Sequence, residues 1–371
     1  MKHPFTTVKI ATFTLGLIMS ISSSAQDIGN LLKGGKDDVQ KILGAYISPG
    51  LDAMASGLNS GWYNSAQTKK VFRVDIRVGS ALVMAPSSEK SFDISKLDLK
   101  LLTPANSANT IAPTFLGSTN DGPKLNILSP AVGNISSTTI GNMTLPKGFT
   151  NGFAFAPQAQ INVGTGVWGK NTDISLRFVP QITISNFSMG MWGIGLRHDL
   201  YQWIPGLSKV RLFDLALSLG YTRMSFEYKN IGLKPELGHV PADGTARDES
   251  KFSNQNLETV LSGFNAEVLI SKKLLFFTPY FSLGYGYSSS SLKLKGDYPI
   301  VSDPILNSNG TIQQTYSNWK DPLSISSSKN NVYATAGFQL NILWVLRLYG
   351  SYTIGSLYNS ANIGTGIGFD F

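Results

Sequence analysis

Few residues in this chain of 371 could carry acid–base, nucleophilic or metal chemistry. The sequence has no Cys, so it offers no thiol nucleophile, no thiolate metal site and no disulfide framework. Of its three His, His3 lies in a predicted signal peptide, which leaves too few for a zinc site of three His. His198 and Asp199 are the only neighbouring His–acid pair, but consecutive side chains on a strand point to opposite faces. We therefore predict that His198 stabilises a turn, and that the chain is not an enzyme and binds no cofactor or metal.

Six charged residues fall on the polar faces of predicted strands and are the candidates for lining an interior. At the middle of a bilayer, a basic side chain that faces lipid costs about 2–4 kcal/mol, so such residues belong inside a barrel. They could form an ion-pair network that seals the interior or a ring that sets the selectivity of a pore, and the sequence leaves both open. The six are Asp173, Arg177, Arg197, Asp214, Glu267 and Arg347.

Most of the chain from Val71 onward alternates large apolar with small polar residues, the period of two that is typical of β-strands. In the last such stretch, Ile363 and Ile367 share one face, while Asn362 and Gly364 share the other. The stretches are about 11 to 17 residues long, which is enough to cross a bilayer at a tilt. A bilayer requires β structure to close on itself, and a small polar face suits a closed interior. We predict an all-β fold, a closed antiparallel transmembrane β-barrel of ten to fourteen strands.

Alternation alone would also fit a soluble sandwich with one wet face. The transmembrane barrel makes a sharper prediction about individual side chains. Leu217, Leu283 and Phe338 should face lipid, whereas Ser218 and Gly337 should face inward.

The predicted connections are short on one side of the barrel and long on the other. Short ones fall near 168–171, 200–210, 271–274 and 343–345, and long polar ones at 229–256 and 294–328. Short inner turns and long outer loops are the outer-membrane pattern. The stretch 85–151 is rich in Ser, Thr, Asn and Pro, and is either one very long outer loop or one or two more strand pairs.

The chain begins with a predicted signal peptide at residues 1–25. A basic flank precedes the apolar run from Ile10 to Ile21, which is too short to span a bilayer, and small residues up to Ala25 suit cleavage there. We predict a signal peptide at 1–25, a helical plug or hatch segment at 26–70 and the barrel at 71–371.

Within 26–70, apolar residues at helical spacing predict a helix over 37–48, ended by Pro49-Gly50. Its apolar face must be buried. The helix could plug the barrel from the periplasmic side, lie on the surface of the inner leaflet, or cap the barrel end without a further role. The residues expected to pack the hatch are Val39, Ile42, Leu43 and Tyr46.

Composition and charge exclude two other classes. Only 15% of residues are charged and 11% are aromatic, unlike a disordered chain. The formal net charge of +8 is spread along the sequence, without a basic stripe interleaved with aromatic residues. We therefore expect no nucleic-acid partner.

Short stretches along the chain carry a family resemblance: Gly61-Trp62-Tyr63-Asn64, residues 174–182, residues 193–200 and Trp203-Ile204-Pro205. They resemble an uncharacterised outer-membrane family with a helical N-terminal extension ahead of its barrel. Phe371 ends an alternating strand, and looks like the terminal signal read by the barrel assembly machinery. The resemblance implies a barrel in outer-membrane lipid, exported with a cleaved signal peptide and assembled by that machinery.

More distantly, the layout is similar to the FadL-type long-chain fatty acid transporters. That likeness implies a hydrophobic small-molecule ligand and a hatch inside a fourteen-stranded barrel, although this sequence shows fewer clear strands. Two functions stay open. One is a transporter or channel for small or hydrophobic molecules, and the other is a non-conducting structural or interaction barrel that presents its outer loops. A continuous apolar pocket would favour import, and an interior filled by paired charges would favour the second.

Overall fold

The computed structural model describes residues 35–129, 136–165, 171–204, 212–306, 308, 310–342 and 345–369. The predicted signal peptide at 1–25 and the predicted assembly signal at Phe371 lie outside this part of the chain, so both stay predictions. Among the described residues, no helix is both long and apolar enough to span a membrane.

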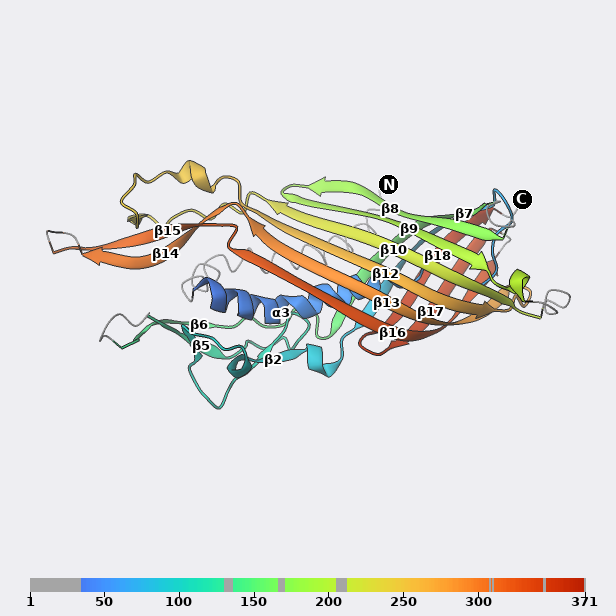
Figure 1. The fold of residues 1–371 in the computed structure, drawn as a ribbon, viewed down its shortest axis with the longest axis horizontal. Helices are drawn as coiled ribbons and strands as arrows, with labels where there is room; N and C mark the ends of the chain where they lie inside the picture. Colours follow the sequence, from blue (N-terminus) through green and yellow to red (C-terminus); the bar gives the residue numbers. More distant parts are fainter. Residues whose placement is uncertain are drawn as a thin grey trace, which may run out of the picture.

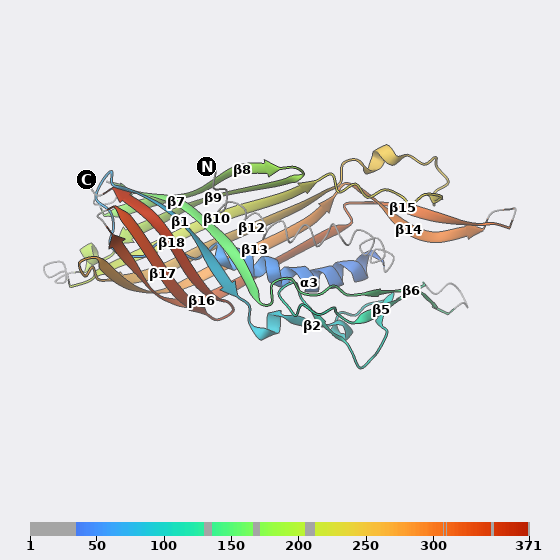
Figure 2. The same cartoon turned by 180° about the vertical axis from the view of Figure 1, so that it is seen from behind.

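Ten long strands pair into one closed barrel, in the order β1-β18-β17-β16-β13-β12-β10-β9-β8-β7. The ring closes because β1 pairs antiparallel with both β18 and β7 (Figure 2). The predicted closed antiparallel barrel is confirmed, with a strand number at the lower limit of the predicted range. The barrel strands are β1 (Val74–Met84), β7 (Phe153–Thr165), β8 (Thr172–Ile184), β9 (Phe187–Asp199), β10 (Asp214–Lys229), β12 (Asn256–Ser271), β13 (Phe277–Lys295), β16 (Leu323–Ile342), β17 (Leu346–Gly355) and β18 (Asn359–Phe369).

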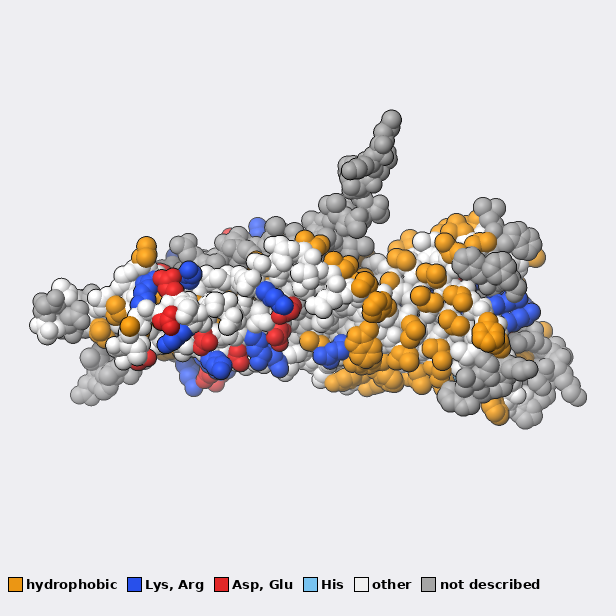
Figure 3. Space-filling view, turned by 90° about the horizontal axis from the view of Figure 1, so that it is seen from above, with side chains coloured by type: hydrophobic (Ala, Val, Ile, Leu, Met, Phe, Trp, Pro, Cys, Tyr) orange, Lys and Arg blue, Asp and Glu red, His pale blue; other side chains and the backbone are white. Residues whose placement is uncertain are grey.

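The alternation along these strands places large apolar groups outside and small polar groups inside. Leu283 is 59% exposed, and Leu217 and Phe338 also face outward, whereas Ser218 is fully buried. Figure 3 shows a belt of apolar side chains over one half of the face in view, while most of the charged groups on this face lie over the other half. A closed barrel with such a belt has the surface of a membrane-spanning wall.

The two ends of the barrel differ in their connections. Short connections join β7 to β8, β12 to β13 and β16 to β17 at the end where β1 begins and β18 ends. We call this the inner end, because transmembrane barrels have short turns on the periplasmic side. At the opposite, outer end the connections 85–152, 230–255 and 296–322 are long, and β12, β13 and β16 are among the longest strands of the barrel (Figure 1). This is the predicted asymmetry.

The long outer connections fold into an outer cap, made of residues 85–151, 230–255 and 296–322. The described residues of 85–151 add no strand to the barrel and instead form the small sheets β2-β4 and β3-β5-β6. The expected loop at 294–328 contains a hairpin, β14 with β15, to which β11 is added. The short elements are η1 (Ser87–Glu89), β2 (Ser91–Asp93), η2 (Ile94–Lys96), β3 (Leu102–Pro104), β4 (Ile111–Pro113), β5 (Lys124–Leu128), β6 (Thr139–Thr144), η3 (Tyr201–Trp203) at the inner end, β11 (Val240–Pro241), η5 (Glu249–Phe252), β14 (Asp297–Leu306) and β15 (Ile312–Lys320).

The N-terminal helix α3 (Lys36–Gly57) continues past Pro49, so the prediction that Pro49-Gly50 ends it is wrong. Proline removes one helical N–H. Every residue from Pro49 to Gly57 is buried, however, and this packing holds the helix together across the break. Just before the proline, the Tyr46 carbonyl accepts a hydrogen bond from the Phe115 N–H at 2.8 Å.

The helix enters the barrel from the end that carries the long connections, which is the outer end by the usual pattern of transmembrane barrels. Of the three placements left open by the sequence, a plug from the periplasmic side does not fit this geometry. α3 begins between the β14–β15 hairpin and the β5–β6 sheet of the outer cap, and its last turns lie inside the barrel (Figure 1). Residues 58–70, which form the plug, then run through the interior to the inner end, where β1 begins. The apolar face of the helix finds its partners in the cap, whose sheets the sequence did not reveal.

Candidate functional site

The plug occupies the barrel interior with two aromatic side chains, Trp62 and Tyr63. Both are buried, and Trp62 is only 1% exposed. The wall makes room for the indole with glycine, since a Cβ at Gly195 or Gly220 would come within 2.6 Å or 2.4 Å of the Trp62 ring. The plug is therefore packed into a shaped space in the wall.

Arg177 on β8 binds the plug through its backbone and its indole. Its guanidinium lies 3.9 Å from the Trp62 ring centroid, a distance that gives a strong cation–π contact. The same group donates to the carbonyls of Leu58 and Ser60, both at 2.7 Å. Because Arg177 is 1% exposed, water does not compete for these bonds, and the wall recognises the path of the plug backbone.

Arg197 and Asp173 form a second, paired contact with the plug. They lie on the neighbouring strands β9 and β8, directly opposite each other, and form a buried ion pair. Arg197 also donates to the Ser65 carbonyl at 2.5 Å, and Asp173 accepts from the Lys69 N–H at 2.8 Å. One ion pair thus satisfies a backbone acceptor and a backbone donor of the plug.

A third cluster gathers three cations around Asp75 on β1. Its carboxylate lies 3.0 Å from Arg347, 3.4 Å from Lys69 and 3.6 Å from Arg77. Arg77 also donates to the Trp62 carbonyl at 2.8 Å. The cluster joins β1, β17 and the plug next to the seam between β1 and β18.

Of the six predicted lining residues, all are buried within the barrel, but they do not form one ring. Asp173 and Arg197 pair with each other, and Arg347 pairs with Asp75. Arg177 binds the plug directly, and Asp214 lies apart at the inner end of β10. Glu267 lies on β12 and accepts from the Ser282 hydroxyl at 3.0 Å.

Sequence reasoning missed Asp75, Arg77, Lys69 and the plug aromatics as site residues. The signal for two of them was present, because Asp75 and Arg77 alternate with Val74, Ile76 and Val78 in β1. Lys69, Trp62 and Tyr63 precede the first strand, where no periodicity marks an inward side. Their role is visible only in the folded chain.

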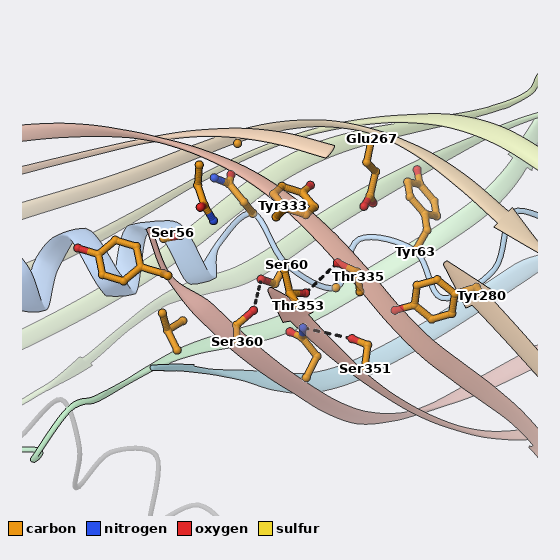
Figure 4. Close-up of a pocket in the computed structure, with 17 residues that line it drawn as sticks. Ser56, Ser60, Tyr63, Glu267, Tyr280, Tyr333, Thr335, Ser351, Thr353 and Ser360 are labelled. Carbon is orange, nitrogen blue, oxygen red and sulfur yellow. Dashed lines mark hydrogen bonds between the residues drawn. The ribbon is translucent and has the colours of Figure 1, made fainter. Parts of the chain in front are cut away.

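A small polar cavity remains between the plug and the wall strands β16, β17 and β18. Its volume is about 30 Å³, enough for a water molecule or two. Figure 4 shows Glu267, Tyr280 and Tyr333 around it, and a hydrogen bond between Thr335 and Thr353, which also line it. The lining is mostly hydroxyl, amide and carboxyl groups, which suits water better than a hydrophobic molecule.

The predicted hatch residues pack chiefly against the outer cap. Val39 and Ile42 belong to a core with Leu102, Leu125 and Tyr298 of the cap. Leu43 and Tyr46 pack against the core that lies between the helix and the strand ends. Val39 and Ile42 are therefore buried by apolar residues of the cap.

Tyr46 links the helix to the cap through its hydroxyl as well. Burial raises the pKa of Tyr46 to about 12, so the hydroxyl stays protonated to a more alkaline pH than that of an ordinary tyrosine. It donates to the Lys147 carbonyl at 2.7 Å. The hydroxyl therefore acts as a fixed hydrogen-bond donor.

His198 lies in contact with the turn that follows β9. Its ring is 2.8 Å from the Thr172 hydroxyl and accepts from the Trp203 indole at 2.9 Å. Asp199 accepts instead from the Tyr201 N–H at 2.8 Å. In the described part of the chain, no group of three His, Cys, Asp or Glu side chains is placed to hold a metal ion.

A closed barrel with an apolar belt, a polar interior and a plug from its own chain defines the class: an outer-membrane β-barrel with an internal plug. The chain belongs to a family of unknown function, DUF6588, whose model matches residues 1–369. This agrees with the resemblance to an uncharacterised outer-membrane family. No curated protein matches the sequence.

Solved outer-membrane proteins show a low likeness. The attachment invasion locus protein Ail of Yersinia pestis is 10% identical, over 81% of this chain and 99% of its own, with a TM-score of 0.26. The outer membrane protease OmpT from Escherichia coli is 9% identical, over 84% and 98%, with a TM-score of 0.28. The β domain of the Bordetella autotransporter BrkA is 10% identical, over 81% and 100%, with a TM-score of 0.25. The FadL likeness is not shown by these comparisons, and the barrel itself follows from the strand pairing.

Proposed function

We propose that this protein is a non-conducting, non-catalytic barrel of the outer membrane, whose plug braces a folded cap at the cell surface. The main observation behind this proposal is that arginines of the barrel wall donate hydrogen bonds to backbone carbonyls of the plug. Arg77, Arg177 and Arg197 donate to plug carbonyls at 2.5–2.8 Å from three separate strands. Such buried charge-assisted bonds would all have to break for the pore to open.

The interior supports sealing better than transport. Asp173, Arg197 and Arg347 are paired, Arg177 binds the plug backbone, and the polar cavity beside the plug has room for only a water molecule or two. Import of a hydrophobic molecule would need an apolar path, and this lining is polar. The hydrophobic ligand and the transporter role inferred from the FadL likeness therefore find no support in this geometry.

The plug and the cap are parts of one continuous brace. At the start of α3, Asp38 accepts from three successive backbone N–H groups of the cap, of Lys100, Leu101 and Leu102, at 2.7–3.0 Å. Further along, Asp52 accepts from the Ser290 and Ser327 hydroxyls of the wall at 2.6 Å and 2.7 Å. The helix thus ties the cap to the strands that carry it. Contact with membrane lipid follows from the belt, while the barrel assembly machinery stays a predicted partner.

Conductance in planar bilayers tests the sealed barrel. The parent protein should show no steady current, because the plug fills the interior. Arg177→Met removes the bonds to the Leu58 and Ser60 carbonyls and should produce flickering conductance steps.

Arg223→Met is the matched control, since Arg223 lies on β10 but faces outward. It should stay as silent as the parent. A parent protein that conducts steadily would refute the proposal and favour the channel.

A further inference from the structure

We propose that the N-terminal segment crosses the membrane through the barrel that it plugs, so that the start of α3 is displayed outside the cell. Each barrel would then export part of its own chain, in a single event during assembly. This inference rests on the outer-membrane placement proposed above and goes beyond the sealing role.

The described segment runs the whole length of the barrel in one direction. At the inner end, the Phe72 N–H donates to the Gly164 carbonyl at 2.9 Å, and the Ala66 N–H donates to the Ser271 hydroxyl at 2.9 Å. Halfway along, Asn59 donates to the Tyr287 carbonyl at 3.2 Å.

Beyond the belt, the helix contacts only the outer parts of the strands and the cap. Gln40 donates to the Ser324 carbonyl at 3.1 Å, at the outer end of β16, and Asp38 binds the cap at Lys100. Residue 36 and residue 73 therefore lie at opposite ends of the barrel (Figures 1 and 2).

The lengths of the connections decide which end faces out. The folded cap and the three long connections stand at the end of the barrel where α3 begins, and the connections between barrel strands at the other end, where β1 begins, are all shorter than these three. Transmembrane barrels have short turns on the periplasmic side and long loops outside. Lys36 is thus on the outer side and Val74 on the inner side.

A chain made inside the cell must then move residues 36–57 across the membrane. This stretch carries Lys36, Asp37, Asp38, Lys41 and Asp52, and charges are costly in the hydrocarbon of a bilayer. The barrel interior is polar and removes that cost.

Absence of cysteine makes the sidedness directly measurable. Single-cysteine variants of the full chain are treated on intact cells with a maleimide that does not cross membranes, and again after the outer membrane is opened. Asp37→Cys reports the start of α3, and Lys36→Cys repeats the test one residue earlier. Both side chains are exposed.

Two exposed lysines serve as references for the two sides. Lys251 lies in the outer cap and Lys273 in an inner turn, and each is replaced by Cys in its own variant, Lys251→Cys and Lys273→Cys. We expect Asp37→Cys and Lys251→Cys to be labelled equally before and after opening, and Lys273→Cys only after opening.

The references separate two kinds of failure. If Lys251→Cys is labelled on intact cells while Asp37→Cys and Lys36→Cys react only after opening, the export inference is overturned and the membrane placement stands. If Lys251→Cys also reacts only after opening, or Lys273→Cys reacts on intact cells, the placement and orientation of the barrel fail, and the inference fails with them.

Discussion

The N-terminal segment is held in opposite ways at its two ends. In the barrel interior, the plug is bound by arginines, carboxylates and backbone hydrogen bonds, with Arg177 stacked on Trp62. In the outer cap, α3 adds apolar packing to the hydrogen bonds of Asp38, with Val39 and Ile42 in a core with Leu102 and Tyr298. The same stretch of chain therefore changes its mode of attachment where it leaves the membrane.

The difference follows from what surrounds each end. The small polar residues that line the wall offer little apolar surface, so the plug is held by directional bonds that dry surroundings strengthen. The outer cap stands in water, where burying apolar surface is the main driving force. The contrast predicts that inner and outer substitutions fail in different ways.

The largest effect should come from Arg197→Met in the interior. It leaves Asp173, which is fully buried, without its cation, and breaking a buried ion pair costs about 3–5 kcal/mol. The free energy of unfolding in vesicles measures the loss. Adding Asp173→Asn should recover part of it, and a loss below about 1 kcal/mol, the range of a surface pair, would contradict the role given to this pair.

At the outer end, Ile42→Ala should cost about 2–5 kcal/mol of cap stability, because it leaves a cavity in a packed core. The cap should become sensitive to limited proteolysis while the barrel keeps its heat-modifiable migration on gels. Lys36→Ala, exposed on the same helix, should change stability by no more than about 0.5 kcal/mol. If the barrel unfolds together with the cap, the two ends are not separate units.

Along β13, two outward-facing positions can test where the apolar belt ends. Leu283→Arg puts a charge into the belt and should cost about 2–4 kcal/mol if it lies near the midplane. Ser291→Arg, on the same face of the same strand but nearer the outer end, should cost about 0–1 kcal/mol. Equal costs in a vesicle unfolding assay would mean that the belt does not end between these two positions.

The smallest expected effect is at Asp52, where the two modes of attachment meet. Asp52→Asn weakens the bonds from Ser290 and Ser327 and removes the attraction to Lys329 at 3.9 Å. We expect a loss of about 1–3 kcal/mol, typical of a hydrogen bond to a charged group. Asp37→Asn, exposed on the same helix, is the control. Equal stability of the two variants would contradict the proposed role of Asp52 in holding the helix to the wall.

Much of the wall could be predicted because its signal is local. The period of two assigned Leu283 to the outside and Ser218 to the inside, since neighbouring side chains of a strand must point apart. The same rule marked Asp173, Arg177, Arg197, Asp214, Glu267 and Arg347 as inward residues.

Local pattern also indicated that the N-terminal segment contains a helix, but it misjudged where the helix ends. Burial of the residues after Pro49 overrides the usual effect of proline, and burial depends on neighbours far along the chain. The small sheets of 85–151 escaped prediction for a related reason, because their strands are only three to six residues long and show little alternation.

By itself, the sequence determined the barrel, its two faces and the charges that had to lie inside, because these depend on residue type and spacing along one strand. Only the tertiary structure decided which charge meets which partner and from which end the helix enters. Arg347 reaches Asp75 across the seam between the first and last strands, and Val39 meets Tyr298 in the cap. Such contacts join residues hundreds of positions apart, and they exist only once barrel closure brings them together.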